Sequence, residues 1–187
     1  KEKEVLKTEL RAIRGVVKEG FDNIGVMISM VQNPQELQRF KIMAREVGLE
    51  PHEDFDVGIM VELPAAALII DEFIEEGVDF VSFDPSVLTQ FTLGVDKDNE
   101  EVRDIYDEEH PAVERLLKES IEKCRKNDVE TSVQGGPEIS LDLVEELVKY
   151  GVKSISVDSD LVREVRRIIS RTEKEIILER VREELDN

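Results

Sequence analysis

Short apolar runs alternate with longer amphipathic stretches along most of the chain. Apolar runs bounded by turn-forming residues are typical of buried strands, whereas apolar residues that recur every three or four positions indicate helices. We therefore predict five strands, each followed in the chain by a helix, and an additional helix over residues 3–19. The strands are predicted at residues 23–31, 56–63, 79–84, 129–135 and 154–158.

Prolines and glycines mark the predicted helix boundaries, because proline suits the first turn of a helix and glycine its end. The stretch after the third strand is different. We predict that residues 85–110 form a long polar loop, since they contain the run Asp-Lys-Asp-Asn, and that the next helix begins at Pro111. The other predicted boundaries are helix starts at Pro34 and Pro64 and helix ends at Gly48 and Gly77.

Repeated strand–helix units predict an α/β fold with parallel strands and right-handed crossovers. An open doubly wound sheet and a (β/α) barrel both satisfy this pattern, and in both the chemistry gathers at the carboxyl ends of the strands. Glu62 stands out there, because it ends an apolar strand immediately before Leu63 and Pro64. We expect its side chain to point into the cavity that the strands surround. The alternative is that Glu62 is a solvated acid at the start of a helix, where the helix dipole favours a negative charge. The strand ends carry Ser29, Gln32, Glu62, Asp84, Ser86, Gln134, Asp158 and Ser159.

Composition narrows the classes of function. The 187 residues have a net charge of −19, which repels nucleic acid and anionic membranes, and no apolar run approaches the length of a membrane span. The N-terminus has no apolar signal segment, so we expect a cytoplasmic protein. Cys124 is the single cysteine, which excludes a disulfide framework. Abundant Glu, Lys and Arg beside few Asn, Gln, Cys and Met are typical of a thermophile.

Three segments resemble one known family. "VGIMVELPAAALIIDEFIEEGVDFVSFDPSVLTQFTLGVDKDNEEV", "YDEEHPAVERLLKESIE" and "GVKSISVDSD" are similar, in that order, to the C-terminal barrel of the phosphoenolpyruvate (PEP)-utilising enzymes, which include PEP synthase and pyruvate phosphate dikinase. The resemblance runs from about Glu9 to the helix after Ser159. It implies five of the eight units of a TIM-type (β/α)8 barrel, a Mg²⁺ site, and phosphate transfer between pyruvate and a phosphohistidine on another domain.

The resemblance also implies roles for individual residues. Glu62 in Met-Val-Glu-Leu-Pro matches the family's glutamate ligand of Mg²⁺. The position of the second metal carboxylate is Val87, so Asp84 is the nearest candidate to replace it. Lys97 stands where the family has an arginine. The substrate-binding positions that remain are expected at Ser86, Thr89, Gln90 and Gln134.

The family's proton donor is a cysteine at the next strand end, and it aligns with Val133. Cys124 lies near the far end of the preceding predicted helix and cannot replace it. We therefore assign no catalytic residue. His110 is expected to cap or pack rather than to bind a ligand, and His52 belongs to a loop without a family counterpart.

These departures predict a PEP synthase-like domain with impaired catalysis and weak or lost Mg²⁺ binding, acting as an assembly or regulatory module. Two alternatives stay open: an active Mg²⁺-dependent phosphotransferase, and a sensor of PEP or pyruvate. Expected partners are the remaining half of the barrel or the phosphohistidine domain of a PEP synthase-like chain.

Residues 1–171 are predicted to form the barrel segment and residues 172–187 a helical extension. The final helix outruns the needs of a barrel, which predicts a homo-oligomer held partly by this extension. Its expected apolar side consists of Val165, Ile168, Ile169, Thr172, Ile176 and Val181.

Overall fold

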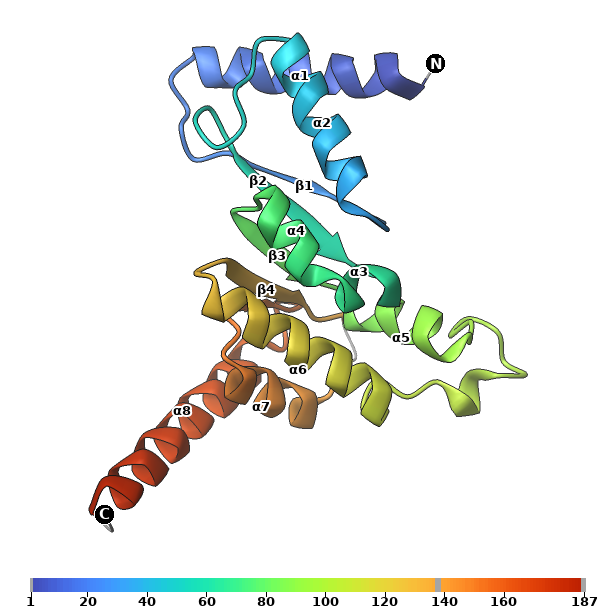
Figure 1. The fold of residues 1–187 in the computed structure, drawn as a ribbon. Coiled ribbons are helices and arrows are strands. Elements are labelled where there is room, and N and C mark those ends of the chain that lie inside the picture. Colours follow the sequence, from blue (N-terminus) through green and yellow to red (C-terminus); the bar gives the residue numbers. More distant parts are fainter. Residues whose placement is uncertain (1, 137–138, 186–187) are drawn as a thin grey trace.

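A computed structural model describes residues 2–136 and 139–185 (Figure 1). Five parallel strands form one sheet in the order β1-β2-β3-β4-β5, which is also their order in the chain. The strands are β1 (Gly25–Ile28), β2 (Asp56–Val61), β3 (Phe80–Phe83), β4 (Glu130–Gln134) and β5 (Ser154–Ser156). The helices are α1 (Glu2–Lys18), α2 (Pro34–Glu46), α3 (Pro64–Leu68), α4 (Ile70–Glu76), α5 (Pro85–Leu93), α6 (Pro111–Lys126), α7 (Leu141–Tyr150) and α8 (Val162–Leu185), with the 3₁₀ turn η1 (Arg103–Ile105).

The strand order decides between the two architectures that the sequence leaves open. A doubly wound sheet needs a point where the strand order reverses, so that helices cover both faces. Here every crossover moves to the next strand in the same direction, which places the crossover helices on one face, as in an arc of a barrel. The structure therefore confirms the α/β fold and has the strand arrangement of a partial barrel.

Alternate side chains of the strands form the core with these helices. Val57, Ile59 and Val61 of β2 are completely buried, as are Val81 and Phe83 of β3. They belong to one hydrophobic cluster that includes residues of α2, α4, α6 and α7. Since burying such a side chain contributes roughly 1.5–3 kcal/mol, this layer fixes which face of each strand turns toward the helices.

On the opposite face, the ring of Phe80 lies across Gly58 of the neighbouring strand. A Cβ atom added at Gly58 would lie 2.2 Å from Cε2 of Phe80, and one added at Gly25 would lie 3.1 Å from Cε1. The two glycines leave room for the ring on this face of β1 and β2. Phe80 thus fills the amino-terminal part of the concave face, and the carboxyl-terminal part is left for polar residues.

The predicted loop after β3 is wrong in its first part. Residues 85–93 form the helix α5, which Asp84 caps and which begins at Pro85. Gly94 ends it in the left-handed conformation, with a φ of 66°. The polar residues beyond Gly94 obscure this helix in the sequence, although Asp84 followed by Pro85 is an N-cap signal.

The helix predicted from Pro64 to Gly77 is divided in two. Helices α3 and α4 meet at Ile69, whose φ and ψ of −110° and 28° are not helical. The break keeps Ala66 and Ala67 buried in α3 and Ile70 and Phe73 buried in α4. A single apolar stripe in the sequence therefore corresponds to two short helices with separate buried faces.

Helix α8 is continuous from Val162 to Leu185, so the predicted boundary between residues 171 and 172 falls inside a helix. Its first half packs against α7, and its second half projects away from the sheet (Figure 1). Residues 186–187 of the predicted extension lie outside the described residues. No helix in the described ranges is both long and apolar enough to cross a bilayer.

Candidate functional site at the carboxyl ends of the strands

Glu62 follows β2 directly and is only 9% exposed. Its Oε2 atom accepts a hydrogen bond of 2.5 Å from the backbone N–H of Met30, which follows β1. Met30 has a φ of 54°, the left-handed region that is unfavourable for a residue with a side chain. The carboxylate that the family resemblance assigns to Mg²⁺ therefore holds a strained turn in the loop between β1 and α2.

Asp84 has a similar structural role at the end of β3. Its Oδ1 atom accepts a hydrogen bond of 3.0 Å from the backbone N–H of Val87, which makes it the N-cap of α5. A carboxylate at this position satisfies an otherwise unpaired N–H and interacts favourably with the helix dipole. Capping explains why an acid stands here without any metal.

Glu62 and Asp84 are the two carboxylates that directly follow neighbouring strands, and each already accepts a hydrogen bond from the backbone. Val61 and Phe83 are paired in the register of β2 and β3, so Glu62 and Asp84 follow equivalent positions on adjacent strands. Each carboxylate already accepts a backbone N–H, and Val87 supplies no oxygen. Among the described residues there is no group of three or more His, Cys, Asp or Glu side chains that could hold a metal ion. Mg²⁺ is usually held by one or two carboxylates together with waters and substrate phosphate oxygens, so these two acids could supply only part of its octahedral coordination.

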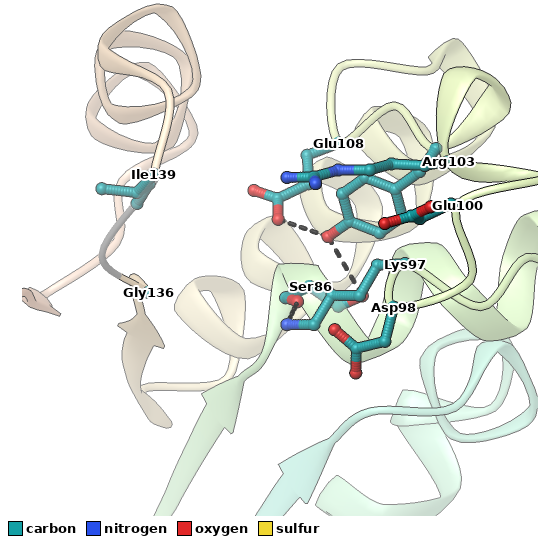
Figure 2. Close-up of a pocket in the computed structure, with 9 residues that line it drawn as sticks. Ser86, Lys97, Asp98, Glu100, Arg103, Glu108, Gly136 and Ile139 are labelled. Carbon is teal, nitrogen blue, oxygen red and sulfur yellow. Dashed lines mark hydrogen bonds between the residues drawn. The ribbon is translucent and has the colours of Figure 1, made fainter.

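A hollow of about 420 Å³ lies beside this edge, between the start of α5 and the loop that follows it (Figure 2). The ammonium group of Lys97 donates a hydrogen bond of 2.8 Å to Oγ of Ser86. Tyr106 donates its hydroxyl hydrogen to Glu108 over 2.5 Å and lies 3.4 Å from the carbonyl oxygen of Ser86. The hollow is lined by Ser86, Lys97, Asp98, Glu100, Arg103, Tyr106, Glu108, Gly136 and Ile139.

The electrostatics of the hollow are mixed. Burial, followed by the hydrogen bond to Glu108, raises the pKa of Tyr106, so this phenol remains a neutral donor at physiological pH. Lys97 and Arg103 bring positive charge, while Asp98, Glu100 and Glu108 bring negative charge. Such a lining can bind a small molecule that has both an anionic group and hydrogen-bond donors.

The four predicted substrate-binding residues do not form one cluster of exposed groups. Ser86 and Gln90 both contact Lys97, since Oε1 of Gln90 accepts its backbone N–H over 3.4 Å. Thr89 is completely buried, and its hydroxyl has no hydrogen-bond partner among the described atoms. Gln134 is exposed at the end of β4. Only Ser86 of the four lines the hollow.

At the end of β4, the position that faces the candidate site is Gln134, one residue after Val133, which the sequence aligned with the family's cysteine. Val133 is completely buried in the core, so its side chain points toward the helices and cannot meet a ligand at the strand ends. Because successive strand residues point to opposite faces, Gln134 is the residue that reaches this region. Its amide is not an acid near neutral pH. Neither residue can replace a cysteine as proton donor.

Cys124 cannot supply a proton either. It is completely buried in α6, and burial, with a smaller contribution from Asp71, raises its pKa to about 12. The two histidines also have structural roles. His110 is the N-cap of α6, where Nδ1 accepts the backbone N–H of Ala112 over 3.2 Å, as predicted. His52 pairs with Asp79 over 2.8 Å.

Sequence reasoning did not identify Arg103, Tyr106 and Glu108 as residues of a pocket. They belong to the connection between α5 and α6, which has no regular period. The conjunction of one tyrosine with a basic and an acidic residue within six positions was the available signal. Its significance depends on the return of this loop over Ser86, which local sequence does not specify.

Comparisons with known proteins agree with the fold and the motifs. Residues 1–174 match the family described as PEP-utilising enzyme, PEP-binding domain. The chain is 46% identical over 173 residues to the phosphoenolpyruvate synthase of Pyrococcus furiosus, with 92% of this chain and 21% of that protein covered. It is also 46% identical over 181 residues to the probable phosphoenolpyruvate synthase of Methanocaldococcus jannaschii, with 97% and 15% covered. The chain thus spans about a fifth or less of the length of these relatives.

Solved structures support the same architecture. A citrate lyase from Burkholderia xenovorans superimposes with a TM-score of 0.63 at 14% identity, over 89% of this chain and 53% of that one. A pyruvate kinase from Cryptosporidium parvum gives 0.61 at 13% identity, over 87% and 34%. At such identities the likeness establishes the fold alone. The match over residues 1–174 and the synthase relatives establish more: this chain belongs to the PEP-utilising enzyme family and corresponds to its PEP-binding domain.

Proposed function

We propose that this chain is a PEP synthase-like domain with impaired catalysis that acts as an assembly or regulatory module. The observation that carries the proposal is the use of Glu62 and Asp84 as acceptors for the backbone N–H groups of Met30 and Val87. Glu62 is explained by the turn at Met30, and Asp84 by the N-cap of α5. Selection for structure alone would therefore retain them.

The chemistry of phosphoryl transfer supports this reading. Transfer depends on metal ions and cationic groups that are positioned around the phosphate. Glu62 and Asp84 directly follow β2 and β3, and Asp158 lies two residues after β5. Lys97 reaches this edge only from a loop. With no thiol at the end of β4, enolate protonation also lacks its donor. Phosphoryl transfer and enolate protonation are therefore both affected.

A turnover assay tests the proposal. The 187-residue chain is mixed with a phosphorylated histidine carrier domain, pyruvate and Mg²⁺, and PEP formation is measured, with the Pyrococcus furiosus synthase as positive control. We expect no PEP above background. Turnover that disappears in Glu62→Gln would instead support the alternative function, an active Mg²⁺-dependent phosphotransferase that works with a phosphohistidine domain.

The hollow at Ser86 supports a second candidate function, a sensor of PEP, pyruvate or a related acid. Its cationic groups, Lys97 and Arg103, can bind a carboxylate. Calorimetric titration with pyruvate and PEP tests this function. Binding that is weakened by Lys97→Met, but not by Lys126→Met on the surface of α6, would support a sensor.

The sheet itself supports the expected barrel partner. β1 and β5 are its edges, and each is bonded to a strand on one side only within the described residues. Strands from the remaining half of a barrel, on this polypeptide or another, would pair with both. Co-purification of the chain with a separately expressed amino-terminal half-barrel tests this. Protection of β1 and β5 amides from hydrogen exchange is the expected result, and unchanged exchange would contradict it.

Helix α8 supports self-association. Its last turns leave Ile177, Leu178 and Val181 exposed by 59%, 54% and 46%. Exposed apolar residues on one side of a projecting helix are typical of a protein–protein contact. The expected apolar side needs correction, however, because Val165, Ile168 and Thr172 are buried against the domain itself, whereas Val181 lies on another side of the helix.

A further inference from the structure

Helix α8 has two opposite faces of different kinds. At about 100° per residue, the buried residues Val165, Ile168 and Thr172 lie together on the side that packs against the domain. About half a turn away is a second side, which we call the outer face of α8. It consists of Arg163, Arg166, Arg167, Ser170, Lys174, Ile177, Leu178, Val181 and Leu185, and all nine residues are exposed.

The outer face is basic in its first half and apolar in its second. Residues 162–174 contain five of the 25 basic residues of the chain and only two acids, in a protein of net charge −19. Within the described part of the chain, Arg163, Arg166 and Lys174 make no ion pair, and Arg167 has only a 3.9 Å contact with Glu164. This is a positive surface on an acidic molecule, and it continues into an apolar surface.

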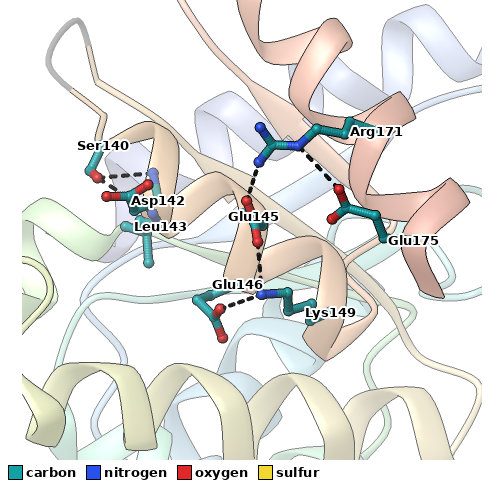
Figure 3. A network of polar contacts seen from close by, with 8 residues as sticks. All are labelled: Ser140, Asp142, Leu143, Glu145, Glu146, Lys149, Arg171 and Glu175. Carbon is teal, nitrogen blue, oxygen red and sulfur yellow. Dashed lines mark hydrogen bonds and ion pairs between the residues drawn. The ribbon is translucent and has the colours of Figure 1, made fainter. Parts of the chain in front are cut away.

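A complementary surface exists on the same chain. A shallow groove between the start of α6 and α7 is lined by Glu109, Glu114, Asp142, Leu143, Glu145 and Glu146, and we call it the α6–α7 groove. Figure 3 shows Glu145 and Glu146 paired with Lys149, and Arg171 of α8 reaching Glu145. Within residues 2–136 and 139–185, neither Glu114 nor Asp142 forms an ion pair. The groove therefore keeps uncompensated negative charge, and its one apolar lining residue, Leu143, is buried in the core.

We propose that the outer face of α8 docks into the α6–α7 groove of a second copy of this chain. This inference rests on the assembly role proposed above and names the surfaces that perform it. Copies of a protein with a net charge of −19 repel each other, so their association requires a segregated positive surface that meets a negative one. The outer face of α8 and the α6–α7 groove satisfy that requirement.

The arrangement of the outer face favours a protein partner over a membrane. Helices that lie on membranes have an apolar stripe along their whole length with basic residues beside it. In α8 the basic and apolar parts follow each other along the axis. The basic half thus meets the acids of the groove, while Ile177, Leu178 and Val181 lie beyond it along the helix.

Sedimentation velocity of the 187-residue chain tests the proposal. We expect assemblies larger than a monomer in about 50 mM NaCl and their dissociation in about 500 mM NaCl, because contacts between exposed charges are screened by salt. The variant Arg163→Glu/Arg166→Glu/Lys174→Glu should be monomeric at both concentrations. Lys18→Glu/Arg39→Glu/Lys126→Glu is the matched control, since it changes the net charge equally on other helices and should assemble like the parent chain.

A charge exchange identifies the partner surface. Glu114→Lys/Asp142→Lys should be monomeric alone, and an equimolar mixture with the α8 variant should restore a complex. Circular dichroism of each variant verifies folding. A monomeric parent chain in low salt, assembly that persists in the α8 variant, or a mixture that stays monomeric overturns the proposal. A monomeric chain that shows no turnover refutes docking but agrees with impaired catalysis. A chain that assembles and forms PEP agrees with docking but refutes impaired catalysis.

Discussion

The Glu62 carboxylate lies 2.5 Å from the backbone nitrogen of Met30, across the carboxyl ends of β2 and β1. This contact joins a residue of the family's metal motif to a backbone position in the left-handed region. A left-handed residue other than glycine costs about 1–3 kcal/mol and persists only where its surroundings hold it. The contact therefore has a thermodynamic consequence that catalysis does not require.

Glu62→Gln should lower the free energy of unfolding by about 1 kcal/mol, because a neutral amide oxygen accepts this hydrogen bond less strongly than a carboxylate. Urea denaturation followed by circular dichroism measures the change. Glu75→Gln on the exposed side of α4 is the control and should change stability by less than about 0.5 kcal/mol. Equal effects of the two substitutions would mean that Glu62 does not support the turn.

Lys41 should make stability depend on alkaline pH. It is 5% exposed, and burial lowers its pKa below the ordinary value despite the nearby Glu76. The unfolded chain then binds more protons than the folded chain, so Lys41 makes stability rise with pH between its folded pKa and its unfolded value of 10.5. Denaturation at about pH 8 and pH 10 should show a smaller rise in Lys41→Met than in the parent chain. An identical pH dependence would contradict the burial effect.

Mg²⁺ with oxalate, a mimic of the pyruvate enolate, should leave the thermal midpoint unchanged at millimolar concentration. A ligand stabilises a protein appreciably only when its concentration exceeds the dissociation constant. Val87 stands where the second metal carboxylate is expected, and the described residues hold no group of three or more His, Cys, Asp or Glu side chains that could bind a metal ion. Differential scanning calorimetry measures the midpoint. Micromolar binding that disappears in both Glu62→Gln and Asp84→Asn would identify Asp84 as a relocated ligand.

Cys124 should resist thiol reagents in the folded chain. The thiolate is the reactive form, and this thiol is completely buried with a pKa of about 12. Labelling should therefore follow global unfolding and accelerate steeply with urea. A Cys124→Ala/Ser170→Cys variant, with its thiol on the exposed side of α8, should react at once. Rapid labelling of native Cys124 would indicate that α6 opens locally.

Ending the chain at Thr172 should reduce the mass of the assembly, because the exposed residues Ile177, Leu178 and Val181 are then removed. The buried contacts of α8 with α7 remain, so the domain should still fold. Light scattering measures the mass, and a chain with serine at these three positions tests the side chains without truncation. An unchanged mass in both variants would exclude this end of α8 from the interface.

The alternation of strands and helices was predictable because each unit carries its own periodicity and end signals. The choice of a barrel arc was not, since strand order depends on contacts between distant segments. The same limit applies to the site. Glu62 and Asp84 were expected at strand ends and lie there, but the contact of Glu62 with Met30 spans 32 residues and depends on strand register. The approach of Tyr106 to Ser86 depends likewise on the path of an irregular loop.

The two sheet edges have a consequence for the colloidal behaviour of this chain. An edge strand offers unpaired N–H and C=O groups to any extended segment, and proteins often block such edges with charged side chains. β1, from Gly25 to Ile28, has no charged residue. Mutual repulsion from the net charge of −19 must then keep copies from pairing edge to edge. Near the isoelectric point of about 4.5 that repulsion vanishes, and aggregation through β1 becomes fastest.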